Sequence, residues 1–200
     1  MIDNPFREKL ARLTNLICKP YLFFGLTPNQ LTIIGFLIAA LSAMAVLGLH
    51  PGWAVVLWWI SRYFDGTDGI LARATNRSTE FGAYLDIVLD MASYSLMVVA
   101  LSLVWPKYEL AWNFVLFFYV LCIASALAYG NLQRISGSTP PDNRGLRLAS
   151  GLAEGGETGI FYSIILLFPK SLPIALFCWL GILAFTVVSR SVLAYRELNF

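Results

Sequence analysis

Long apolar segments follow one another along most of the chain, separated by short polar or turn-like stretches. A helix needs about 20 mainly apolar residues to cross a bilayer. Hydrophobic residues make up 58% of the 200 positions and charged residues only 13%, about half the charged share of a soluble domain. Six segments meet the requirement when their bounds shift by a few residues: 31–49, 53–72, 82–104, 110–131, 157–169 with its neighbours, and 173–194. The sequence therefore predicts an all-α polytopic membrane protein, with a six-helix bundle over 31–194 in a single domain of residues 1–200.

The basic residues are concentrated on one side of these predicted spans. Lys107 and Lys170 are the basic residues on the opposite side. Short loops rich in Lys and Arg stay in the cytoplasm. Both termini and the loops after the second and fourth spans are therefore predicted to face the cytoplasm. The formal net charge of +2 gives no indication of a nucleic-acid partner.

The segment 5–19 has the pattern of a helix that lies in the lipid interface. Its basic residues fall away from an apolar face, whose members recur at helical spacing: Phe6, Leu10, Leu13 and Ile17. Thr27 to Gln30 then has the arrangement of a capping box at the start of the first span. We expect an N-terminal amphipathic helix on the cytoplasmic leaflet, followed by the six-helix bundle.

Four aspartates stand close to the predicted hairpin between the second and third spans. Asp65 and Asp68 are three residues apart, and Asp86 and Asp90 are four apart, so each pair shares one helix face. The hairpin lies around 74–80, and counting outward from it at about 1.5 Å per residue brings all four carboxylates to a similar depth. The sequence therefore predicts that they converge.

Such a cluster of negative charge at a membrane boundary needs neutralisation. Desolvation costs several kcal/mol for each buried charge. Arg62 and Arg73 could compensate part of it, but oxygen ligands at close spacing favour hard divalent cations such as Mg²⁺ or Mn²⁺. Two such ions would balance four carboxylates. A pair of metal ions is suited to an in-line displacement at phosphorus.

Small residues lie beside the aspartates and leave room for a ligand. Gly69 and Ala72 follow Asp68 on the same helix, where a ligand or a second helix can approach the backbone. Arg73 can offer several donors to a diphosphate. Gly82 permits close packing at the start of the third span. These features favour a diphosphate substrate.

Eight of these positions together resemble the signature DxxDGxxAR…GxxxDxxxD of the CDP-alcohol phosphotransferase family. The matching residues are Asp65, Asp68, Gly69, Ala72, Arg73, Gly82, Asp86 and Asp90. The six-span layout and the N-terminal interfacial helix also look like that family, so the resemblance covers essentially the whole chain. It implies an enzyme of phospholipid synthesis that transfers a phosphatidyl group from CDP-diacylglycerol to an alcohol and releases CMP.

The resemblance also implies roles for individual residues. Two divalent ions, Mg²⁺ or Mn²⁺, would be bound by the four aspartates, with Asp90 also acting as general base. The cytidine diphosphate would be contacted by residues in three segments of the chain: Gly69 and Arg73, Thr79, and Pro28 with Asn29. For Pro28 and Asn29 an ordinary helix start is an equally good explanation. The resemblance further suggests a homodimer in a bacterial inner membrane, with its active site facing the cytoplasm.

The acceptor alcohol is not specified by the sequence. Arg134, Arg144 and Arg147 are candidates for binding a phosphorylated or acidic alcohol, although they equally serve as markers of the cytoplasmic side. Glu154 and Glu157 fit either a solvated helix start or a contact to an amino-bearing acceptor. The third span lacks the proline and lysine typical of many phosphatidylglycerophosphate synthases, which disfavours glycerol 3-phosphate.

Two other functions are compatible with parts of this pattern. The same motif serves enzymes that transfer a phospho-amino-alcohol from CDP-choline or CDP-ethanolamine to diacylglycerol. Intramembrane carboxylates also occur in cation transporters. A transporter is expected to have carboxylates spread through the membrane depth and internal repeats, whereas this sequence has one cluster near one side and no repeat.

Overall fold

The computed structural model describes residues 14–135 and 155–198, and these form helices and short connections without a β-strand. Seven α-helices are described: α2 (Thr14–Phe23), α3 (Pro28–Leu47), α4 (Pro51–Ala74), α5 (Glu80–Val104), α6 (Glu109–Ile135), α7 (Gly155–Leu167) and α8 (Leu172–Leu198). Two 3₁₀ turns, η1 (Pro106–Tyr108) and η2 (Pro169–Ser171), connect α5 to α6 and α7 to α8. The all-α prediction is confirmed.

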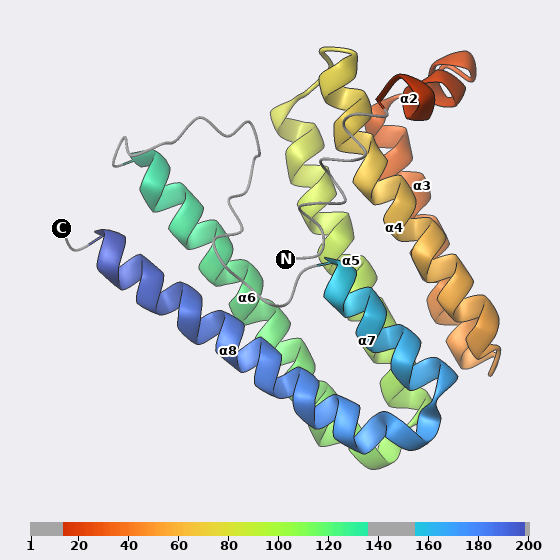
Figure 1. The fold of residues 1–200 in the computed structure, drawn as a ribbon, viewed down its shortest axis with the longest axis vertical. Coiled ribbons are helices and arrows are strands. Elements are labelled where there is room, and N and C mark those ends of the chain that lie inside the picture. Colours follow the sequence, from red (N-terminus) through yellow and green to blue (C-terminus); the bar gives the residue numbers. More distant parts are fainter. Residues whose placement is uncertain (1–13, 136–154, 199–200) are drawn as a thin grey trace.

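The helices form two groups (Figure 1). Helix α3 packs extensively against both α4 and α5, and α2 lies against one end of this group. Helices α6 and α8 run side by side and diverge from the first group toward the C-terminus. Helix α7 packs against α4. The backbones of α4 and α5 make few direct contacts, so long side chains connect them.

Within the described residues, four segments are long and apolar enough to cross a membrane: Pro28–Leu47, Glu80–Val104, Pro106–Leu132 and Pro169–Glu197. They correspond to four of the six predicted spans. Helix α4 is long enough, but charged residues in its second half lower its hydropathy. Helix α7 has 13 residues and is too short by itself. Four of the six predicted spans are therefore confirmed as long apolar helices. That α4 and α7 also cross the membrane stays a prediction.

The predicted interfacial helix 5–19 falls mainly on residues 1–13, which lie outside the described part of the chain. Helix α2 covers the remainder and continues to Phe23. Its inner face buries Ile17, Cys18 and Tyr21 against α3 and α4, whereas Phe23 is 85% exposed. Packing against the bundle therefore fixes this end of the segment, and the interfacial role of 5–19 stays a prediction.

Local signals in the sequence explain where α3 and α5 begin. The backbone N–H of Gln30 donates to the Thr27 hydroxyl at 3.4 Å, and the backbone N–H of Thr27 donates to the Gln30 side chain at 2.8 Å. The predicted capping box is thus confirmed. At the start of α5, Thr79 accepts from the N–H of Gly82 at 3.0 Å. Between α4 and α5, Asn76 has a positive φ of 53°, a conformation that asparagine tolerates well.

The core is aromatic and tightly packed where α4 meets α5 and α7. Trp58 contacts Tyr94 and Tyr162 with ring centroids 5.6 and 4.9 Å apart. At Gly159 of α7, an added Cβ would lie 3.0 Å from the ring of Trp59. The absence of a side chain there allows α7 to approach α4 closely. This packing holds the first group of helices, which carries all four aspartates, in a fixed arrangement.

Candidate active site

The four aspartates lie at the hairpin end of α4 and α5, which is also the end where α2 packs (Figure 1). Asp65 and Asp68 are in the second half of α4, and Asp86 and Asp90 are in the first half of α5. Helix α3 packs against both and fixes their relative position. The predicted placement of the two pairs on facing helices, joined by a short hairpin, therefore agrees with the fold.

Asp68 accepts hydrogen bonds from two neutral donors. Its side chain lies between α3 and α4, and the residue is only 6% exposed. The hydroxyl of Thr32 on α3 donates to Asp68 Oδ2 at 2.6 Å, and the N–H of Gly69 donates to Oδ1. Both contacts orient the carboxylate without neutralising its negative charge.

The next residue on α4, Thr67, connects this region to α2. Tyr21 Oη lies 3.1 Å from Thr67 Oγ1, and Thr67 donates to the carbonyl of Tyr63 at 2.9 Å. Because the single hydroxyl proton of Thr67 goes to that carbonyl, the Tyr21 hydroxyl donates to Thr67. Burial raises the pKa of Tyr21 to about 12. Helix α2 is thereby attached to the turn of α4 that carries Asp68.

Asp65 and Asp90 share a cationic partner, Arg62. Nη1 of Arg62 lies 3.6 Å from Asp65 Oδ2 and donates a hydrogen bond to Asp90 on the other helix. The same nitrogen lies 3.3 Å from the hydroxyl of Tyr94. The guanidinium also stands over the rings of Trp58 and Tyr94, 4.9 and 5.1 Å from their centroids. Arg62 therefore spans the space between α4 and α5.

The carboxylate of Asp90 is close enough to Asp65 and Asp86 to be repelled by both. Among the described residues, however, no three acidic, His or Cys side chains are gathered tightly enough to bind a metal ion. Arg62 gives the physical reason, because its guanidinium stands between Asp65 and Asp90. The predicted binding of two ions by this quartet stays a prediction.

The donor set nevertheless fits a hard divalent cation. All four side chains offer carboxylate oxygens, the ligands that Mg²⁺ and Mn²⁺ prefer. A positive group, the guanidinium of Arg62, already occupies the space between two of them. The chemistry of these ligands is therefore suited to a divalent cation.

The residues predicted to bind the nucleotide fall into two groups. Arg73 lies over Gly69, where an added Cβ would stand 3.2 Å from its Nη1. At the start of α5, an added Cβ on Gly82 would stand 3.0 Å from both Asn29 Oδ1 and Thr79 Oγ1. The small residues therefore leave space beside polar side chains. Pro28, the first residue of α3, is buried and serves the helix start.

The predicted acceptor residues fall largely outside the described part of the chain. Arg144, Arg147 and Glu154 lie between 136 and 154, and the side chain of Arg134, in the last turn of α6, is likewise outside it. Glu157 is in the first turn of α7 and is half-buried. Its place in the first turn agrees with a helix start, and the choice between that role and a contact to the acceptor stays open.

Thr32 was not identified from the sequence, and Arg62 was considered only for general charge compensation. The available signals were weak. Thr32 follows Pro28 by four residues and Arg62 precedes Asp65 by three, so each shares a helix face with a site residue. Spacing alone does not show which residue of another helix they contact.

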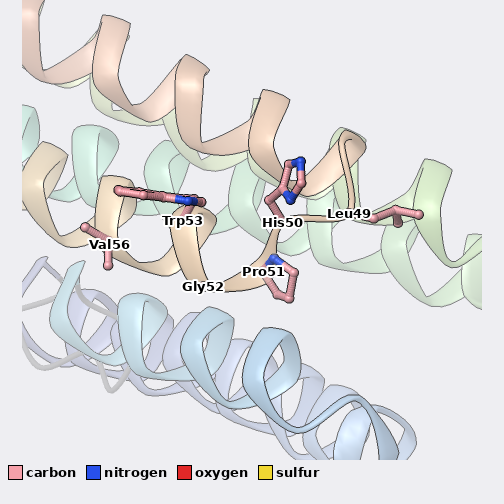
Figure 2. Close-up of a pocket in the computed structure, with 6 residues that line it drawn as sticks. All are labelled: Leu49, His50, Pro51, Gly52, Trp53 and Val56. Carbon is pink, nitrogen blue, oxygen red and sulfur yellow. The ribbon is translucent and has the colours of Figure 1, made fainter.

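A shallow, open pocket of about 490 Å³ lies at the opposite end of α3 and α4. It is lined by the turn between these helices and the first residues of α4: Leu49, His50, Pro51, Gly52, Trp53 and Val56 (Figure 2). None of the four aspartates borders it. His50, the single histidine of the sequence, is therefore remote from the acidic site.

The fold and the site define a membrane-embedded enzyme whose acidic residues suit group transfer at phosphorus. Residues 25–193 match the protein-family model described as CDP-alcohol phosphatidyltransferase, and the chain belongs to this family. It is accordingly a transferase of phospholipid synthesis and an integral membrane protein. The family predicted from the eight-residue signature is confirmed.

Two relatives match over most of both chains. The inner membrane protein YnjF of Escherichia coli is 36% identical over 175 residues, which cover 84% of this chain and 83% of that protein. The archaetidylinositol phosphate synthase of Pyrococcus horikoshii is 31% identical over 166 residues, which cover 82% of each.

The fold is similar to that of the phosphatidylinositol phosphate synthase of Mycobacterium tuberculosis. A crystal structure of that enzyme with CDP-DAG bound matches with a TM-score of 0.64 at 22% identity, covering 92% of this chain and 94% of the other. A second structure, in complex with manganese and citrate, matches with a TM-score of 0.66 over 91% and 88%. At 22% identity, these matches show that the two proteins share a fold.

Proposed function

We propose that this enzyme transfers the phosphatidyl group of CDP-diacylglycerol to a small alcohol and releases CMP, in a reaction that requires two divalent cations. The observation that carries the proposal is the position of Asp65 and Asp68 opposite Asp86 and Asp90, at one end of a helix pair whose backbones make few direct contacts. The donor is supported by the CDP-DAG-bound structure of the M. tuberculosis relative.

The four aspartates are the residues that would hold the ions. Manganese in a structure of the M. tuberculosis relative supports this assignment. When bound, two divalent ions supply positive charge that polarises the diphosphate and stabilises the negative charge developing on the transferred phosphorus group. The carboxylates of Asp65 and Asp68 approach from α4, and those of Asp86 and Asp90 from α5.

The remaining chemistry belongs to side chains of this protein. Asp90 accepts the proton of the acceptor hydroxyl as its oxygen forms a bond to the phosphorus next to diacylglycerol. The bond from that phosphorus to the bridging oxygen breaks, and CMP leaves with the bonding electron pair. Arg73 donates hydrogen bonds to the diphosphate. Because Gly69 has no side chain, the diphosphate can approach the backbone of α4 there. Asn29, Thr79 and Gly82 border the nucleotide.

We propose an inositol phosphate as the acceptor. Two of the relatives are named as synthases of inositol phosphate lipids. Arg134, Arg144 and Arg147 would then bind the phosphate of the acceptor, because guanidinium groups match phosphate oxygens in geometry and charge. The distribution of basic residues supports a site that faces the cytoplasm, and we propose a homodimer on the basis of the family resemblance.

The proposal is tested by CMP release from purified protein in detergent. CDP-diacylglycerol is supplied with Mg²⁺ or Mn²⁺ and, in separate reactions, inositol phosphate, serine or glycerol 3-phosphate. We expect CMP with inositol phosphate, and none when the divalent ions are chelated. CMP release with serine or glycerol 3-phosphate alone would contradict the acceptor, and release only from CDP-choline or CDP-ethanolamine with diacylglycerol would contradict the donor.

A further inference from the structure

We propose that Arg62 competes with the divalent ions for Asp65 and Asp90, and that its displacement is a step in forming the metal-loaded site. The inference rests on the proposed function, since it concerns the same carboxylates. It goes further by assigning to Arg62 control over how tightly the ions bind.

One nitrogen of Arg62 serves both helices. Nη1 lies 3.6 Å from Asp65 one turn further along α4, and it donates to Asp90, which is 28 residues away on α5. Asp65 and Asp90 are members of different pairs in the acidic quartet. A cation between them therefore occupies space that an ion bridging α4 and α5 would need, and it repels such an ion.

The guanidinium is held in this place by groups other than carboxylates. Its side chain is only 9% exposed, and its guanidinium carbon lies 4.9 and 5.1 Å from the ring centroids of Trp58 and Tyr94, which are themselves in contact. Nη2 lies 3.1 Å from the hydroxyl of Ser61, and Nη1 lies 3.3 Å from that of Tyr94. Cation–π contacts of this kind are strong where water is excluded.

These neutral partners define where Arg62 goes when ions arrive. A small rotation of the side chain removes Nη1 from the two carboxylates while the ring contacts and the Tyr94 and Ser61 hydroxyls remain available. The charge of Arg62 is thus still accommodated after displacement. Arg62 carries a single positive charge, less than the charge of a divalent ion, so such an ion can compete with it for Asp65 and Asp90.

The direct test is Mn²⁺ binding to purified protein in detergent, without nucleotide, measured by electron paramagnetic resonance. In Arg62→Gln the competing charge is removed, and we expect Mn²⁺ to bind about tenfold more tightly than in the wild type. Arg62→Lys retains the charge and should stay within about threefold of the wild type. Arg77→Gln is the matched control: it removes one exposed positive charge near the hairpin, and screening should keep its effect below about twofold.

A purely structural role for Arg62 predicts the opposite sign. Arg62→Gln would then weaken Mn²⁺ binding or leave it unchanged, and either result overturns the proposal. If this variant does not fold, Arg62→Met provides the second test, because it retains a long side chain beside the rings of Trp58 and Tyr94 but removes the charge. We expect Mn²⁺ to bind about tenfold more tightly to Arg62→Met as well, and unchanged or weaker binding there contradicts the proposal.

The same titration separates this inference from the proposed function. If the wild-type protein binds no Mn²⁺ at all, the metal-dependent function fails, and the inference fails with it. If the wild type binds Mn²⁺ and Asp68→Asn weakens that binding, but Arg62→Gln does not tighten it, only the inference fails.

Discussion

Asp68 on α4 and Asp90 on α5 belong to the same acidic site, and each accepts a described hydrogen bond from a donor of different charge. Asp68 accepts hydrogen bonds from a hydroxyl and a backbone N–H. Asp90 accepts one from a guanidinium that also pairs with Asp65. A neutral donor orients a carboxylate and remains in place when a cation binds, whereas a positive partner has to be displaced.

This difference divides the site into two parts. In the preorganised part, around Thr32 and Asp68, hydrogen bonds orient the carboxylate before a cation binds. In the other part, around Arg62 and Asp90, opposite charges hold the side chains together. Thr32 and Asp68 are both buried between two tightly packed helices. Asp90 lies where α4 and α5 are connected by side chains rather than by close backbone packing. We therefore expect substitutions on the Thr32 side to weaken ion binding, and loss of Arg62 on the other side to strengthen it.

The largest effect is expected for the base itself. Asp90→Asn should lower CMP release by about 10²-fold to 10⁴-fold, because the acceptor hydroxyl then has no group to take its proton. Circular dichroism and the thermal unfolding midpoint should stay close to those of the wild type. Full activity in this variant would exclude Asp90 as the base. The comparison of Asp68 with Asp90 would then no longer concern a catalytic residue on α5.

Thr32→Val tests the preorganised side. Valine has nearly the same shape but cannot donate to Asp68, and loss of such a supporting hydrogen bond costs about 10-fold to 100-fold in metal affinity. Thr32→Ser should restore Mn²⁺ binding to near the wild-type level. Ser42→Ala is the matched control, since it removes another α3–α4 hydrogen bond, from Ser42 Oγ to the Ala54 carbonyl at 2.6 Å. Equal losses in Thr32→Val and Ser42→Ala would indicate a general packing effect.

Gly82→Ala should affect the nucleotide more than the ions. The new methyl group would stand 3.0 Å from Asn29 Oδ1 and Thr79 Oγ1 and push both side chains away. We expect the KM for CDP-diacylglycerol to rise roughly fivefold with little change in Mn²⁺ affinity. A change in Mn²⁺ affinity with an unaltered KM would show that Gly82 belongs to the metal side of the site.

The smallest effect is expected at the attachment of α2. Tyr21→Phe removes the hydrogen bond to Thr67 and should lower the free energy of unfolding by about 0.5–1.5 kcal/mol. Because Thr67 retains its backbone partner on α4, CMP release should change by less than about twofold. A large loss of activity in this variant would mean that α2 positions Asp68 through Thr67.

The sequence predicted those features that depend on one helix or one turn. The spacing of Asp65 and Asp68 determines that they share a face, and Thr27 with Gln30 specifies a helix start through contacts three residues apart. Contacts between helices were harder to predict. Helix α3 is apolar on almost every face, so its sequence does not show that Thr32 points toward Asp68. Likewise, the position of Arg62 depends on how α5 aligns Tyr94 and Asp90 beside α4.

Prediction of the membrane spans from the sequence was limited for the same reason. Hydropathy identified the apolar helices α3, α5, α6 and α8, because length and composition suffice for these. Helix α4 combines an apolar first half with the charged residues of the site, and only its partners determine how such a helix is accommodated.

The central claim is that two pairs of aspartates on α4 and α5 bind a pair of divalent ions. The most direct measurement is the number of Mn²⁺ ions bound per chain at saturation, in the wild type and in the double variant Asp65→Asn with Asp90→Asn. We predict about two ions for the wild type and at most one for the double variant. Equal binding by both proteins, or no binding by the wild type above a detergent control, would contradict the claim.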